Sequence, residues 1–283
     1  MSELSIFSLD EISQRLKSNS LPLSGITESG SAEFHILEPS HYIGVSLHAG
    51  HRVRREIFDL MVVSEEDRSR EEDTFTELFI NDFPIRIISL DSRFEYDLNR
   101  EPERSIYSSE RGIWELDIWR CKVEGQLRDD TLVKHKEFHD LVDVVVEYLL
   151  MQFDRLLVYD MHSYCYQREK KQQWYEDPRP EINLGTKSIN RNFFSPMIEQ
   201  FLHGVSGMIM DGHSLRVSEN EAFPGGYLTR KYARTHNQEV LVLAIEYKKI
   251  FMNEWTGELY PSKLKILVDN LMLTKDRILR TKV

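Results

Sequence analysis

The clearest strand in this chain is Leu156-Leu157-Val158-Tyr159-Asp160-Met161-His162-Ser163-Tyr164. A short apolar run that passes into polar residues predicts a buried strand of a parallel sheet. In open α/β sheets, chemistry lies just beyond the carboxyl ends of the strands, which is where His162 would stand. Histidine is the commonest metal ligand, and the Asp160 carboxylate could orient its ring. A polar strand end, with Asp160 capping a turn, accounts for the same residues without a site.

The composition indicates an ordinary globular protein of 283 residues with a formal net charge of -11. Phosphate binding needs a basic surface, so we expect no nucleic-acid partner. No apolar run is long enough to cross a bilayer, and the acidic N-terminal segment, with Glu3, Asp10 and Glu11, does not resemble a secretory signal. Two cysteines are too few for a disulfide framework. We therefore expect a cytoplasmic protein with no membrane partner, and the oligomeric state stays open.

The rest of the chain predicts further elements of an α/β fold. Strands are expected at 42–47, 85–91 and 239–247, and helices at 8–17, 134–153, 195–208 and 262–280, with a helical pattern at 74–80. Loops are expected around Pro22 and Gly25, at 167–180 (which could act as a lid) and at 182–186. Residues 111–130 are an insertion or a covering loop, in which Trp114 and Trp119 suggest packing. Because no repeat or linker is evident, we expect a single domain over 1–283, with a core at about 40–280 and an N-terminal extension at 1–39.

Two more expected strands end in residues that bind metals or transfer protons. His48 follows the strand at 42–47, and Glu246 lies at the end of the last strand. Neighbouring parallel strands bring their carboxyl ends together. A lone buried carboxylate such as Glu246 is either paired or functional, whereas a histidine at a strand end can simply be exposed. The charged segment 64–73 is typical of solvated surface, but one of Glu71, Glu72 and Asp73 could turn inward as an oxygen ligand.

These residue types suit metal-assisted amide hydrolysis. Two histidines and one carboxylate leave an open position on tetrahedral zinc for water. A separate glutamate can then take a proton from that water and pass it to the leaving amine. Arg93, just after the strand at 85–91, suits recognition of a carboxylate, although a weak surface pair with Asp97 is the alternative. His135 and His139 are four residues apart on a helix, but Lys136 replaces the glutamate of the zinc-peptidase pattern. We expect those two histidines on the polar side of that helix.

Several short motifs together resemble the N-formylglutamate amidohydrolase family. They occur in the family's order and extend from about His48 to Glu246. The matching pieces are Leu47-His48-Ala49-Gly50, Arg70-Glu71-Glu72-Asp73-Thr74, Ser92-Arg93 with Asp97-Leu98-Asn99-Arg100, Asp160-Met161-His162-Ser163, and Gly225-Gly226-Tyr227-Leu228-Thr229-Arg230 followed by Ile245-Glu246.

The resemblance implies a zinc carboxypeptidase-like fold, a mixed sheet with helices on both faces, and one catalytic Zn²⁺. It implies His48, His162 and Glu72 as zinc ligands. It also implies Glu246 as general base and acid, and further residues that polarise the scissile carbonyl or bind a small carboxylate-bearing amide: Arg93, Asn99, Arg100, Tyr227 and Arg230.

The acidic segment and the residues after His48 depart from the family pattern, so formylglutamate serves here as the label of a substrate class. Other divalent metals also suit these ligands. Two alternatives to an N-acyl amino acid hydrolase are a carboxypeptidase-like metallopeptidase and a non-catalytic small-molecule binding protein on the same scaffold.

Overall fold

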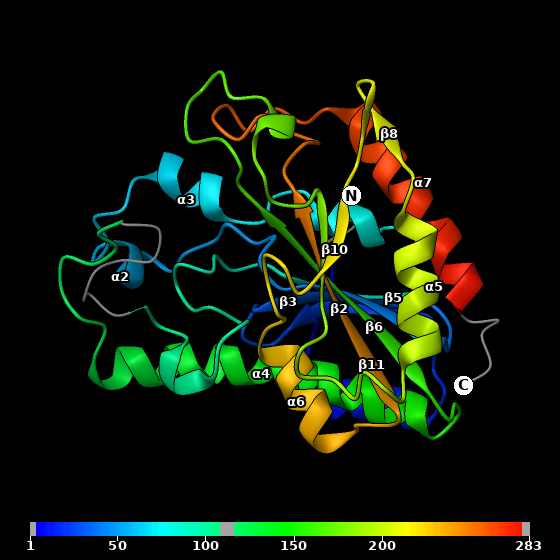
Figure 1. Cartoon of the computed structure of the whole chain (residues 1–283). Coiled ribbons are helices and arrows are strands. Elements are labelled where there is room, and N and C mark those ends of the chain that lie inside the picture. Colours follow the sequence, from blue (N-terminus) through cyan, green and yellow to red (C-terminus); the bar gives the residue numbers. More distant parts are fainter. Residues whose placement is uncertain (1–3, 108–115, 279–283) are drawn as a thin grey trace.

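A nine-stranded twisted sheet forms the centre of the structure, a computed structural model that describes residues 4–107 and 116–278 (Figure 1). The strand order is β1-β2-β3-β5-β4-β6-β11-β7-β10. The strands are β1 Ile6–Phe7, β2 Leu23–Thr27, β3 Ala32–Ile36, β4 Tyr42–Ser46, β5 Ile85–Ser89, β6 Leu156–Tyr164, β7 Ile182–Gly185, β10 Val217–Glu219 and β11 Val240–Lys248. A separate small hairpin joins β8 Ile209–Met210 to β9 His213–Ser214.

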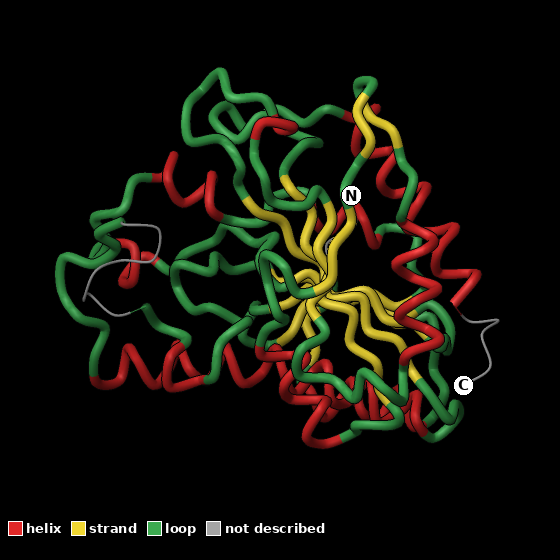
Figure 2. The backbone as a smooth tube through the Cα atoms, viewed as in Figure 1, coloured by secondary structure: helices red, strands yellow, loops and turns green. Residues whose placement is uncertain are grey.

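The central strands β5, β4, β6 and β11 run parallel to one another, whereas β2–β3, β3–β5 and β7–β11 are antiparallel pairs. The sheet is therefore mixed but mostly parallel, as predicted. Its twist makes the strands fan out from the middle of the molecule (Figure 2). Because the four central strands point the same way, the segments that follow them meet at one edge of the sheet.

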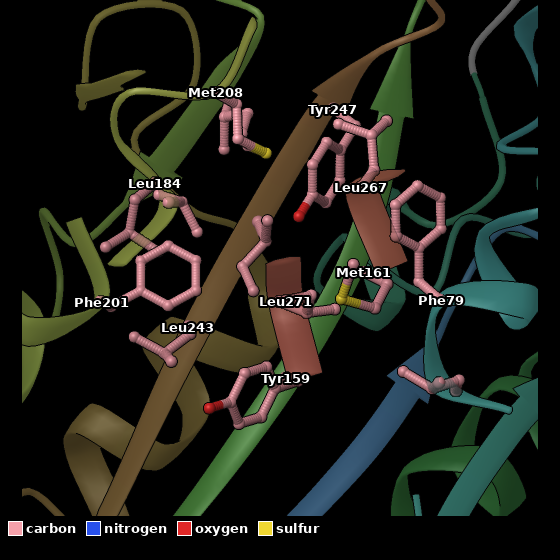
Figure 3. Packing of buried hydrophobic residues seen from close by; sticks show 14 of the residues in the cluster. Phe79, Tyr159, Met161, Leu184, Phe201, Met208, Leu243, Tyr247, Leu267 and Leu271 are labelled. Carbon is pink, nitrogen blue, oxygen red and sulfur yellow. The ribbon is translucent and has the colours of Figure 1, made fainter. Parts of the chain in front are cut away.

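Helices cover both faces of the sheet. They are α1 Leu9–Lys17, α2 Arg55–Phe58, α3 Glu65–Glu71, α4 Gly125–Leu150, α5 Ser195–Val205, α6 Tyr227–Thr235 and α7 Pro261–Ile278, with 3₁₀ turns η1 Thr76–Ile80, η2 Pro102–Arg104 and η4 Trp174–Glu176. One apolar cluster lies between the sheet and α1, α4 and α6, and a second lies on the other face against α5, α7 and η1. Figure 1 shows α4 and α6 on one side of the sheet and α5 and α7 on the other. Figure 3 shows the second cluster, in which Leu267 and Leu271 of α7 pack beside Met161 of β6 and Tyr247 of β11.

Several expected elements are confirmed, with shifted ends. Ser8 caps α1 in a capping box with Glu11, and the strand at 156–164 is buried along its whole length. The helix expected at 134–153 begins earlier, at Gly125, so α4 includes the end of the segment that the sequence left unassigned. Trp119 from that segment is buried in a small third cluster, while Trp114 lies outside the described residues.

Two expected loops are strands instead. The segment with Gly25 is β2, which pairs with β3, and residues 182–185 are β7, which pairs with β11. Both were missed because polar residues and glycines interrupt the apolar signal. In the structure β2 alternates buried and partly buried residues, as a half-covered strand does. The result is that residues before 40 extend the same sheet. None of the helices in the described ranges combines the length and the apolar character that a membrane span requires.

Candidate metal centre

Three parallel strands carry the central residues of the site to one edge of the sheet. His162 is near the end of β6, and Glu246 of β11 stands beside it in register. His48 follows the last residue of β4 by two positions. The structure thus brings together the three residues that the sequence placed at strand ends. The two imidazole centroids are 5.1 Å apart, and both side chains are buried.

The carboxylate between the two histidines belongs to Asp73. Its Oδ2 lies 3.2 Å from Nδ1 of His48 and 3.1 Å from Nδ1 of His162. Within the described part of the chain, these three side chains form a group whose potential ligand atoms all lie within 4.8 Å of one another. Two imidazoles and one carboxylate are the donor set of many catalytic zinc sites.

Glu72 does not lie beside the histidines. Its carboxylate accepts a hydrogen bond from Ser92 Oγ and lies 2.5 Å from Nδ1 of His51. The reason is local: α3 ends at Glu71, and Glu72 has extended backbone dihedrals (φ -73, ψ 151), so that Glu72 and Asp73 point to opposite sides. The backbone N–H of Asp73 donates to the His48 carbonyl at 3.0 Å, which keeps this side chain at the site.

Each histidine also has a carboxylate at its other ring nitrogen. Nε2 of His48 is 2.7 Å from Oδ1 of Asp97, and Nε2 of His162 is 2.9 Å from Oδ1 of Asp160. Carboxylates in this position orient ligating histidines in metalloproteins. The sequence indicated Asp160 for this role, but it gave Asp97 only as a surface partner of Arg93, whereas Asp97 is buried.

This arrangement fits a bound cation. Nδ1 of both histidines faces the same Asp73 oxygen. In the metal-free protein a proton on Nδ1 joins each ring to that oxygen, and a divalent cation can take the place of these protons because it carries the same sign of charge. In addition, both Asp160 oxygens and His162 Nε2 are buried without a well-aligned hydrogen bond to any described residue.

The pKa values of the two inner carboxylates, Asp73 and Glu246, shift in opposite directions. Although burial opposes it, hydrogen bonding from His162 and His48 holds the pKa of Asp73 far below its usual range. For Glu246, burial raises the pKa to about 8; the positive charge of His162 partly opposes this shift and the nearby charge of Asp73 adds to it. Asp73 therefore stays ionised as a ligand must, while Glu246 is poised to exchange a proton near neutral pH.

Arg93 connects this group to the neighbouring loop. Its guanidinium donates to Asp73 and to Asp97, each at 3.4 Å, and to the Tyr107 hydroxyl at 3.1 Å. Arg93 also lines a cavity of about 180 Å³ that contains His48, Asp73, His162 and Glu246. Arg93 thus reaches the site from the side of β5, as the sequence predicted for a residue following that strand.

A second recess, of about 610 Å³, adjoins the first and shares Arg93 and Asn99 with it. Arg100 and Arg230 line this recess together with Arg104. Three predicted substrate residues therefore lie here: Asn99, Arg100 and Arg230. Tyr227 is placed differently, because its ring packs against His135 and His139, with centroid distances of 5.9 and 4.7 Å.

His135 and His139 are buried, so the expectation that they lie on the polar side of α4 is wrong. Nε2 of His135 is 3.1 Å from the carbonyl of Arg100, and Nε2 of His139 is 3.0 Å from that of Leu98. The pair supports the loop that carries Asn99 from behind. Helical spacing could not reveal this, because the loop comes from a distant part of the chain.

Two buried lysines at the end of β11 were also missed. Lys249 Nζ donates to the carbonyls of Arg70 and Glu72, next to Asp73. Lys248 Nζ donates to Glu181 and to three carbonyls of the segment 174–179. Their position just past Glu246, after Tyr247, is the signal that the sequence offers. Through these hydrogen bonds, the two lysines connect the segments 70–72 and 174–181 to the strand that carries Glu246.

The fold is similar to that of solved structures from two bacteria. The crystal structure of N-formylglutamate amidohydrolase from Ralstonia eutropha JMP134 matches with a TM-score of 0.65 and 16% identity over 87% of this chain and 98% of that chain. The gene product Atu2144 from Agrobacterium tumefaciens matches with a TM-score of 0.58 and 16% identity, over 88% and 96% of the two chains. At this identity the likeness concerns the fold alone.

No curated protein matches the chain significantly. The profile of the N-formylglutamate amidohydrolase family, however, matches residues 40–252, which include His48, Asp73, His162 and Glu246. This range covers most of the sheet and every residue of the candidate metal centre. The chain therefore belongs to the N-formylglutamate amidohydrolase family.

Proposed function

We propose that this protein is a zinc-dependent hydrolase that cleaves the amide bond of an N-acyl amino acid. The observation that carries the proposal is the approach of two histidine Nδ1 atoms to one Asp73 oxygen, with Glu246 beside them in the same cavity. His48, Asp73 and His162 would hold the metal. Asp73 replaces Glu72 in the expected ligand set because of where its carboxylate lies. Membership of an amidohydrolase family supports an amide as the bond that is cleaved.

The chemistry divides between the metal and the protein. When bound, zinc supplies a Lewis acid that lowers the pKa of a water molecule to about 7. Glu246 accepts the proton of the attacking water and returns it to the nitrogen of the leaving amino acid. Its pKa of about 8 suits this exchange, and a nearby cation would shift that value downward. Arg93 donates hydrogen bonds toward the scissile carbonyl oxygen as negative charge develops on it.

The recess next to the site would hold the carboxylate of the amino acid. Arg100 and Arg230 are each close to a carboxylate, at 3.2 Å from Asp97 and 3.6 Å from Glu101, while Arg104 makes no ion pair with any residue in the described ranges. Arginine recognises carboxylates through paired N–H groups, which makes this recess suited to an anionic end of the substrate. We further propose that the protein acts in the cytoplasm, where the unpaired thiols of Cys121 and Cys165 would stay reduced.

The test compares wild type with Glu246→Gln, each loaded with zinc. N-formyl- and N-acetyl-glutamate are supplied, and the released glutamate is measured. We expect Glu246→Gln to keep its metal and lose about 100-fold or more of the turnover, because it removes the general base. Full activity in the variant would overturn the role of Glu246, and no release by wild type from any N-acyl amino acid would overturn the proposed reaction. Incubation with unblocked peptides checks whether C-terminal residues are released instead.

A further inference from the structure

The cavity that contains the metal candidates extends beyond them to a second group of side chains. These come from the end of β6, the segment after it and the loop before α6, and we call them the aromatic–arginine wall: Tyr164, Arg168, Arg179 and Phe223. The Arg179 guanidinium lies over the Tyr164 ring, 4.9 Å from its centroid, and the Tyr164 and Phe223 rings are 5.2 Å apart. The wall therefore combines flat apolar surface with cationic groups.

Positive charge dominates this end of the cavity. Arg168 forms no ion pair with any residue in the ranges that the structure describes. Lys249, buried at the same cavity, donates to two backbone carbonyls. Arg179 is paired with Asp177 at 2.7 Å, but that carboxylate does not line the cavity. Three acids line the cavity: Asp73 and Glu246 belong to the metal candidates and the proton-transfer group, and Glu71 is paired with Arg70 at 2.7 Å.

The wall and the arginine-lined recess are separate. Among the residues that the structure describes, the recess shares Arg93 and Asn99 with the cavity, and neither Arg168 nor Arg179 lines it. Two regions with arginine side chains therefore adjoin the reacting centre, and their arginines differ apart from Arg93. An N-acyl amino acid has two ends, and the recess suits the carboxylate of its amino-acid half. The wall then faces the acyl half.

A formyl group would leave this wall without a partner. The cavity volume of about 180 Å³ equals that of about six water molecules in the liquid, at about 30 Å³ each. A formyl group contributes one hydrogen beyond the scissile carbonyl and cannot reach side chains past the metal candidates. A longer acyl chain would lie on the two aromatic rings and bring a terminal carboxylate to the arginines.

We propose that the aromatic–arginine wall is a subsite for an acyl group derived from a dicarboxylic acid, of about the length of succinyl. This inference rests on the proposed amide hydrolysis for its orientation, and it names the substrate class: an N-acyl amino acid that carries an anion at both ends. Arg168 is the specificity-determining residue, because it is the cation of the wall that has no ion-pair partner among the described residues.

The test measures binding rather than turnover. Zinc-loaded Glu246→Gln is titrated by calorimetry with the N-formyl, N-acetyl, N-butyryl and N-succinyl derivatives of glutamate. Butyryl and succinyl have the same chain length and differ in a terminal methyl or carboxylate. We expect succinyl to bind at least tenfold more tightly than butyryl, and Arg168→Gln to abolish that difference. Lys171→Gln, which removes a charge from the same exposed loop but not from the cavity, serves as the matched control and keeps the difference.

Three results would overturn the subsite: equal affinity for succinyl and butyryl, tightest binding of the formyl compound, or a preference that Arg104→Gln removes and Arg168→Gln does not. Turnover by the wild type is then measured separately on the same four compounds. Absence of hydrolysis with the succinyl preference intact would reject the proposed reaction and keep the subsite. Hydrolysis without any preference would reject the subsite alone.

Discussion

Nε2 of His48 lies 2.7 Å from Oδ1 of Asp97, and both side chains are buried. A neutral His48 ring that keeps its proton on Nε2, toward this carboxylate, has Nδ1 free to bind a metal beside Asp73. Partners of this kind are worth about 10–100-fold in metal affinity. We therefore predict that Asp97→Asn weakens zinc binding by about that factor, measured by competition with a chromophoric chelator. Asp129→Asn, which removes an exposed carboxylate from α4, is the control; equal affinity in both variants would contradict the assignment.

The choice between two adjacent acids gives a second prediction. Asp73→Asn should lose stoichiometric metal, because its carboxylate lies between the histidines, whereas Glu72→Gln should retain it. Both residues are buried, so circular dichroism must first show that each variant is folded. Metal content after dialysis then decides. Retention of metal by Asp73→Asn together with its loss from Glu72→Gln would restore the ligand set that the sequence favoured.

His135 and His139, which lie under the 98–100 loop, should make the stability of the fold depend on pH. Burial, together with the charge of His135, lowers the pKa of His139 well below its usual 6.5. The unfolded chain therefore binds a proton at this residue more readily than the folded one does. Its contribution to stability is present above pH 6.5 and is lost as the pH falls below that value.

Urea unfolding of the metal-free protein at pH 7.5 and pH 5.5 measures this effect. We expect the free energy of unfolding to fall less between the two pH values in His139→Gln than in wild type, because glutamine does not take up the proton. His203→Gln replaces an exposed histidine of α5 and should behave like wild type. An identical pH dependence in all three proteins would show that His139 is not held neutral.

Lys249 holds the segment that carries Asp73, so its replacement should lower the free energy of unfolding. Its buried ammonium donates to the carbonyls of Arg70 and Glu72, and these would lose their partner in Lys249→Met. Leaving such groups unpaired costs about 2 kcal/mol, so we expect the free energy of unfolding to drop by about that amount. Lys265→Met removes an exposed lysine of α7 that is paired with Asp269 and should change stability by less than about 0.5 kcal/mol. Comparable losses in the two variants would be evidence against the role of Lys249.

Sequence reasoning found the parts of the site that depend on strand order and missed those that depend on tertiary contacts. The positions of His48, His162 and Glu246 were predictable for two reasons. The end of an apolar run marks the carboxyl end of a strand, and parallel strands bring those ends together. The third metal ligand was not predictable, since the choice between Glu72 and Asp73 depends on the backbone at the last residues of α3.

The same distinction applies to the fold and to α4. The central strands have continuous apolar sequences, whereas β2 and β7 contain glycine and polar residues that are compatible with loops. His135 looks like a surface residue in the sequence because half of its helix is polar. Only the return of the 98–100 loop over α4 buries it, and no local pattern encodes that contact.

The central claim is that one divalent metal binds between His48, Asp73 and His162. The most direct test is the zinc content of the purified protein by elemental analysis, beside that of His162→Ala. We expect about one zinc per chain in wild type and none in the variant. A wild-type protein that holds no metal and takes up none from added zinc would contradict it, and the same two histidines would then belong to a binding protein rather than to a hydrolase.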